Sequence, residues 1–124
     1  MRRTLPLLLA LAACTSSDAG PAGGGPLVLR LVGGAGNDGA VVVVVSGGPV
    51  SSVDVPAGYQ IATNADGAGT HIMVMGNVAD GVIAMINVPD ASRASAYVAT
   101  VVQVADRTSF ALLDPARYQV TVGR

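Results

Sequence analysis

The residues that could carry out catalysis centre on the only histidine of the chain, His71. A histidine can take a proton from a serine hydroxyl when a carboxylate orients its ring. Asp66 lies close before His71 and serines are abundant, so the residue types permit a Ser-His-Asp triad, although no G-x-S-x-G elbow accompanies them. We expect His71 to make ordinary hydrogen bonds in a loop or at a strand end, with a small hydrolase that uses His71 as the alternative.

The stretch that begins at Asn64 resembles part of a calcium-binding loop. Asn64 and Asp66 offer side-chain oxygens, and Gly67 permits a sharp turn. An EF-hand loop needs an acidic residue six positions after its glycine, and Met73 stands there. The chain has no glutamate and no second histidine, so a zinc site of familiar spacing is not available. We predict a flexible turn with no metal and no cofactor, and the sequence leaves open whether the Asn64–Asp66 loop holds an ion weakly.

Residues 34–39, GAGNDG, match the G-x-G-x-x-G pattern of dinucleotide-binding loops, and Asp54 follows fifteen residues after the last glycine. In those proteins the third glycine opens a helix whose N-terminus binds the pyrophosphate. Here Val41 to Val45 follow, and such β-branched residues favour a strand over a helix. The sequence therefore predicts a glycine-rich hairpin loop between two strands. We expect no nucleotide binding, with Asp38 adding negative charge where a phosphate would lie.

The first fourteen residues, MRRTLPLLLALAAC, have the layout of a secretory signal peptide. Arg2 and Arg3 form a positive region, an apolar run follows to Ala13, and small residues precede Cys14. The apolar run is much shorter than the roughly 20 residues that a helix needs to span a bilayer. Residues 11–14, LAAC, resemble the lipobox of bacterial lipoproteins.

This resemblance implies cleavage before Cys14, a diacylglycerol on its thiol and acylation of the new amino group. Cys14 is the only cysteine, so the mature chain would have no free thiol and no disulfide. The predicted lipidation site is Cys14, the predicted partner is a membrane, and Thr15 after it is compatible with sorting to the outer membrane of the cell envelope. The alternative is an ordinary secreted protein in which Cys14 is incidental.

Composition divides the chain into three parts. We predict a signal peptide at 1–13, a lipidated cysteine and a Gly/Ser/Pro-rich linker at 14–26, and a folded domain at 27–124. The formal net charge is −1 and no basic cluster occurs beyond Arg2 and Arg3, which argues against a nucleic-acid partner.

The folded domain has a strand-like pattern nearly throughout, and its core must hold it together without disulfides. Runs rich in β-branched residues are separated by Gly, Pro, Asn and Asp, as in a β-sandwich or barrel. Only 89–96 and 107–117 could hold a helical turn, and the valine run is expected to be buried on both faces. The eight predicted strands are 27–33, 39–47, 50–55, 58–64, 70–76, 81–88, 95–106 and 117–123.

We predict an all-β fold, a single β-sandwich of about seven or eight strands. The order of its runs resembles cohesin-type and immunoglobulin-like modules of bacterial surface proteins. That resemblance implies a binding or structural role without naming a partner. The expected function is therefore that of a lipid-anchored envelope protein, not an enzyme, whose domain binds a protein or polysaccharide or serves a structural role.

Overall fold

The computed structural model describes residues 24–34 and 36–124. Cys14, the signal peptide and most of the predicted linker lie outside the described residues. The described part contains the following strands and 3-10 helices, in chain order: β1 (Gly25–Val32), β2 (Asp38–Ser46), β3 (Ser52–Asp54), β4 (Gln60–Asp66), β5 (Gly69–Val78), β6 (Gly81–Val88), η2 (Ala91–Ala96), β7 (Val98–Asp106), β8 (Leu112–Leu113), η3 (Pro115–Arg117) and β9 (Gln119–Gly123).

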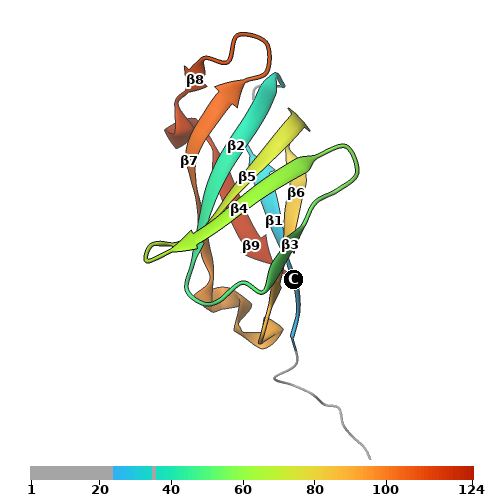
Figure 1. Ribbon diagram of the computed structural model, residues 1–124, viewed down its shortest axis with the longest axis vertical. Coiled ribbons are helices and arrows are strands. Elements are labelled where there is room, and N and C mark those ends of the chain that lie inside the picture. The colour runs from blue at the N-terminus through green and yellow to red at the C-terminus, as the bar shows by residue number, and fades with distance from the viewer. Residues whose placement is uncertain (1–23, 35) are drawn as a thin grey trace, which may run out of the picture.

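The strands form two antiparallel sheets that pack face to face (Figure 1). One sheet has four strands in the order β3-β6-β1-β9, and the other has five in the order β4-β5-β2-β7-β8. The prediction of an all-β sandwich is confirmed. None of the helices in the described ranges is long and apolar enough to span a membrane.

The core lies between the two sheets and comes from alternate residues of the strands. Leu27, Leu29 and Leu31 of β1 point inward from one sheet, and alternate valines of β2 point inward from the other. Burying such aliphatic side chains contributes roughly 1.5–3 kcal/mol each relative to exposure. The buried apolar residues are Leu27, Leu29, Leu31, Val41, Val43, Val45, Ile72, Val74, Val78, Ile83, Ala84, Ile86, Val88, Tyr97, Val101, Val104, Tyr118 and Val120.

The prediction of a hairpin between the first two strands is wrong. β1 pairs with β6 and β9, whereas β2 pairs with β5 and β7 in the opposite sheet. Both strands carry an apolar face, and these two faces meet across the core from opposite sheets. The glycine-rich loop after β1 therefore crosses from one sheet to the other.

The expectation that the valine run is buried on both faces is also wrong. Val41, Val43 and Val45 are fully buried, but Val42 and Val44 are only half-buried because they lie on the side of the sheet that faces solvent. Period-2 alternation is the rule for a sandwich strand, and a run of identical residues hides that alternation.

The boundaries of most elements differ from the sequence prediction by a few residues, and two differences matter most. β1 begins at Gly25, two residues before the predicted start of the domain. The region 107–117, expected to hold a helical turn, contains the short strand β8 as well as η3. The described chain therefore has nine strands, one more than predicted. The turn expected in 89–96 is present as η2, and the Asp90 side chain caps it by accepting a hydrogen bond from the Ser92 amide.

Candidate functional site

The side chains of the five-stranded sheet that point away from the core form a surface that we call the outer face, and it presents several exposed apolar residues among polar ones. In Figure 1 this sheet lies nearer the viewer than the four-stranded sheet. On the outer face Val98 is 56% exposed and Leu112 is 67% exposed, and Met73 and Val102 are exposed as well. An exposed apolar residue is common on its own, whereas several exposed apolar residues on one sheet face make that face a candidate interaction site.

An irregularity in β7 enlarges the outer face. The register of β7 with β2 shifts between Val42 and Val43, which pair with Gln103 and Val101. Val102 is the extra residue, so Val102 and Gln103 are both exposed while Val101 and Val104 point into the core. A bulge re-aims side chains in this way, and here it adds a valine to the solvent-facing side.

The outer face continues into the loop between β7 and β8, which presents Phe110. The Phe110 side chain is 79% exposed, and its backbone has a φ of 62°. For a bulky residue this left-handed conformation is strained. The Phe110 amide donates a hydrogen bond to the Asp106 carbonyl, so the loop holds the ring toward solvent.

The Asp106 carboxylate organises this loop. It accepts hydrogen bonds from the amides of Thr108 and Ser109, and from the side-chain amide of Asn37 at 2.7 Å. The Ser109 amide, followed by the Asn37 side chain, lowers the pKa of Asp106 to about 2. The loop is therefore held by a charged carboxylate at neutral pH and presents Phe110 in a fixed position.

A hollow of about 400 Å³ lies at this end of the outer face, beside Phe110. Residues of three neighbouring strands contribute to it, and the lining is mainly apolar with Arg107 and Asp106 among its polar members. A hollow next to an exposed aromatic ring can receive an apolar side chain of a partner. Its lining residues are Gly39, Ala40, Met75, Gly76, Asn77, Ala105, Asp106, Arg107 and Phe110.

His71 also lies on the outer face, near the beginning of β5. Its Nε2 atom is 3.0 Å from Oδ2 of Asp66, but the two groups are not aligned as a hydrogen bond. The Ala68 amide, which hydrogen-bonds to Asp66, and the nearby His71 ring lower the pKa of this carboxyl. The structure thus brings together two members of the triad that the sequence permitted.

The hollow around His71 does not contain the serine that the Ser-His-Asp triad requires among its described lining residues. Its volume is about 160 Å³, and no cysteine of the described part of the chain lines it either. Within the described ranges no group of three His, Cys, Asp or Glu side chains could hold a metal ion. Asp66 is instead engaged in the tight turn after β4. The residues that line the hollow are Val42, Ala62, Thr63, Asn64, His71 and Met73.

The glycine-rich loop is occupied by contacts within the protein. The amides of Gly33 and Gly34 donate to the carboxylate of Asp80, with the shorter hydrogen bond, from Gly34, at 2.6 Å. As predicted, a strand and not a helix follows this loop, and Asp38 is fully buried and accepts a hydrogen bond from the Tyr118 hydroxyl. Asp54 lies on β3 in the other sheet and hydrogen-bonds to Asn87. The contacts made by the glycine-rich loop and by Asp54 therefore stabilise the fold.

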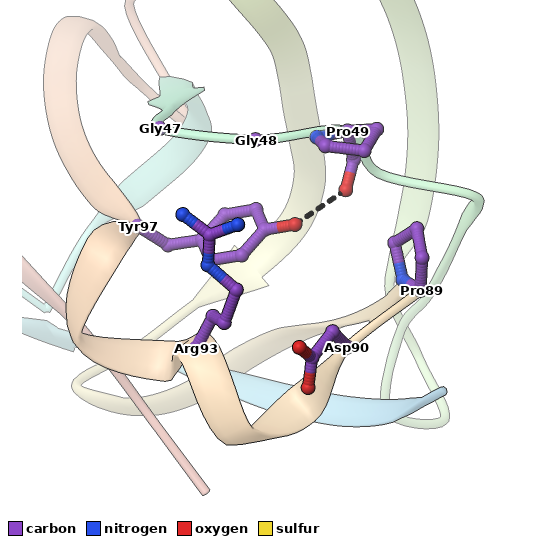
Figure 2. A pocket seen from close by; sticks show the side chains of 7 residues that line it. All are labelled: Gly47, Gly48, Pro49, Pro89, Asp90, Arg93 and Tyr97. Carbon is purple, nitrogen blue, oxygen red and sulfur yellow. Dashed lines mark hydrogen bonds between the residues drawn. The ribbon is translucent and has the colours of Figure 1, made fainter. Parts of the chain in front are cut away.

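A small pocket at the opposite end of the sandwich joins the loop after β2 to η2 (Figure 2). The Tyr97 hydroxyl donates a 2.7 Å hydrogen bond to the Pro49 carbonyl. Gly47 has a φ of 104°, and a Cβ atom there would lie 1.9 Å from the Ala96 carbonyl oxygen. Arg93 and Asp90 complete a volume of about 160 Å³. These contacts anchor a loop that crosses between the sheets, which is a structural role.

Comparison with protein-family models, with curated proteins and with solved structures found no significant match. The class of protein is therefore defined by the fold alone, as an all-β sandwich. The sequence prediction missed the outer face, because the valine run was expected to be buried and Phe110 and Leu112 were assigned to a helical turn. The sequence did contain an indication of this surface. In 95–106 apolar residues occur at both odd and even positions, and so on both faces of the strand.

Proposed function

We propose that this protein is a lipid-anchored protein of the bacterial cell envelope whose β-sandwich binds a protein partner and is not catalytic. The observation that supports binding is the outer face, with its exposed apolar side chains and the adjoining hollow beside Phe110. Contacts centred on buried apolar and aromatic side chains dominate the free energy of protein association.

A protein fits this surface better than a polysaccharide does. Sugar recognition depends on exposed planar rings together with hydrogen-bonding side chains. Tyr97 and Tyr118 are buried, and their hydroxyls bond to Pro49 and Asp38 inside the protein. Phe110 is then the one strongly exposed aromatic side chain of the described residues. An apolar face with one ring is typical of protein docking.

The anchoring part of the proposal rests on residues 11–14, LAAC, which lie outside the described residues. Because β1 begins at Gly25, the tether would comprise 15–24, and a flexible Gly-rich stretch of that length has a reach of roughly 16–19 Å, enough to hold the domain clear of lipid headgroups. Mass spectrometry of the membrane-extracted protein tests the anchor. We expect an N-terminal diacylated or triacylated Cys14, and an unmodified or differently placed N-terminus would contradict lipidation.

Paired substitutions test the outer face. Val98 on the outer face and Val32 on β1 of the other sheet are each 56% exposed, so they form a matched pair. We expect Val98→Asp to abolish capture of the partner from envelope extracts, while Val32→Asp leaves capture unchanged. Equal loss in both variants, or no loss in Val98→Asp, would contradict binding through the outer face.

The alternative function is a small envelope hydrolase that uses His71, and the 3.0 Å approach of Asp66 to His71 is the observation that favours it. The two functions differ in a simple way. His71→Ala should abolish hydrolysis if the protein is such an enzyme, and should leave partner capture intact if the protein is a binding module. Screening the purified protein and His71→Ala with ester and peptide substrates decides between them.

A further inference from the structure

The strand β4 forms an exposed edge of the five-stranded sheet. Among the described residues β4 pairs with β5 alone, over seven residues from Gln60 to Asp66 and without a register shift. On its other side the backbone groups have no strand partner in the described part of the chain. Figure 1 shows β4 as a long, continuous strand at the border of the sheet.

The other three sheet edges are shorter. β3 has three residues, β8 has two, and β9 has five. Natural proteins keep an edge from pairing with other chains by making it short, or by placing Pro, a bulge or a lysine on it. The strand β4 has none of these devices, and its one charged residue, Asp66, stands at the very end.

The core-facing side of β4 is also uncovered over half its length. Thr63 pairs with Ile72, so these two residues lie on the same side of the sheet. Ile72 is fully buried, whereas Thr63 is exposed. Ala65, two residues further along β4 and on the same side of the sheet, is exposed as well. Ile61 in the first half of β4 packs against the core, whereas no described segment covers the core-facing side of the second half of the strand.

The sequence of β4 is compatible with antiparallel pairing to itself. When Thr63 of one copy faces Thr63 of another, Gln60 faces Asp66 and Ile61 faces Ala65. Threonine pairs are favourable across strands, and a glutamine amide can donate to a carboxylate. In this register the two Asp66 carboxylates lie at opposite ends of the seven-residue pairing, so like charges do not meet.

We propose that two copies of this chain associate through their β4 edges, in an antiparallel pair centred on Thr63. The pairing satisfies the free backbone donors and acceptors of both edges and joins the two five-stranded sheets into one. The outer faces of both copies then lie on the same side of the joined sheet. This inference does not depend on the proposed partner binding or on the lipid anchor.

Sedimentation equilibrium of the full-length purified protein over a range of concentrations tests the association. We expect a monomer–dimer equilibrium in the unaltered protein. Thr63→Lys places two like charges directly opposite each other, and should raise the dimer dissociation constant at least about tenfold. Thr121→Lys is the matched control, because Thr121 is an exposed threonine on β9, the longest of the other three edge strands. It should leave the constant unchanged.

Cross-linking provides a second measurement that does not depend on a lysine. Cβ atoms of directly opposed residues in an antiparallel pair lie about 4.5–5.5 Å apart, within reach of a disulfide after small adjustments. Thr63→Cys should form a covalent dimer under mild oxidation, and Thr121→Cys should not. Circular dichroism of each variant establishes that it is folded.

Three outcomes would overturn the proposal. The protein could remain monomeric at all concentrations up to about 1 mM, where an association with any appreciable free energy would be visible. The dimer could resist Thr63→Lys. Alternatively, Thr121→Lys could dissociate the dimer and Thr121→Cys could cross-link it, which would assign the contact to β9. Loss of the dimer in Thr63→Lys alone, with cross-linking of Thr63→Cys alone, supports pairing through β4.

Discussion

The Tyr118 hydroxyl donates a 2.8 Å hydrogen bond to the Asp38 carboxylate, and both side chains are buried between the sheets. Tyr118 directly precedes β9 of the four-stranded sheet, and Asp38 is the first residue of β2 in the five-stranded sheet. This polar contact therefore joins the two layers at one end of an otherwise apolar core. A buried carboxylate is tolerated in such a place because it has hydrogen-bond donors.

We expect Tyr118→Phe to lower the free energy of unfolding by about 1–3 kcal/mol, the usual loss when a buried acceptor loses a hydrogen-bond donor. Urea denaturation followed by circular dichroism measures it. Tyr59→Phe is the control, because the Tyr59 hydroxyl accepts a hydrogen bond from Ala79 in a partly exposed position. A loss in Tyr59→Phe as large as that in Tyr118→Phe would argue against a special role for the Asp38 contact.

Acid should weaken the fold partly through Asp106. Its pKa is about 2 in the folded protein, below the ordinary value of 3.8, because the Ser109 amide and the Asn37 side chain hydrogen-bond to the carboxylate. Between these two pH values the unfolded chain binds more protons, so the stabilisation is complete above pH 4 and is lost toward pH 2. We expect the free energy of unfolding of Asp106→Asn to fall less steeply across this window. Parallel curves for the two proteins would contradict this role.

Phe110→Asn should stabilise the protein and weaken binding at the same time. Asparagine tolerates the left-handed backbone that Phe110 adopts, so the change relieves strain of about 0.5–1 kcal/mol, and the exposed ring contributes little burial. Thermal unfolding measures the gain in stability. Leu112→Asn is the control, since Leu112 is exposed in β8 without a positive φ and should give no gain. A destabilised Phe110→Asn would show that the ring packs on the protein.

Titration with NAD or ATP should give no saturable heat in calorimetry, although the loop from Gly33 to Gly39 contains a nucleotide-binding pattern. The amides of Gly33 and Gly34, which a phosphate would need, already donate to Asp80, and the Asp80 carboxylate would repel a phosphate placed there. Micromolar binding that Gly36→Val abolished would contradict this prediction.

The all-β class of the domain and most of its strands could be predicted from the sequence. β-branched runs separated by turn residues leave no room for long helices, and this local preference is visible without any knowledge of the fold. The absence of a helix after Gly39 follows from the same local chemistry, because five successive valines favour a strand. The lipidation site at Cys14 stays a prediction of the sequence.

The tertiary structure decided which strands pair and which side chains remain exposed. Strand order depends on contacts between residues far apart in the chain, so the sequence alone predicted a hairpin where β1 and β2 lie in opposite sheets. The run of valines has no alternation to distinguish the core side from the solvent side. Only the packing of the second sheet shows that Val41 is buried while Val42 lies on the outer face, because exposure is a property of what covers a strand.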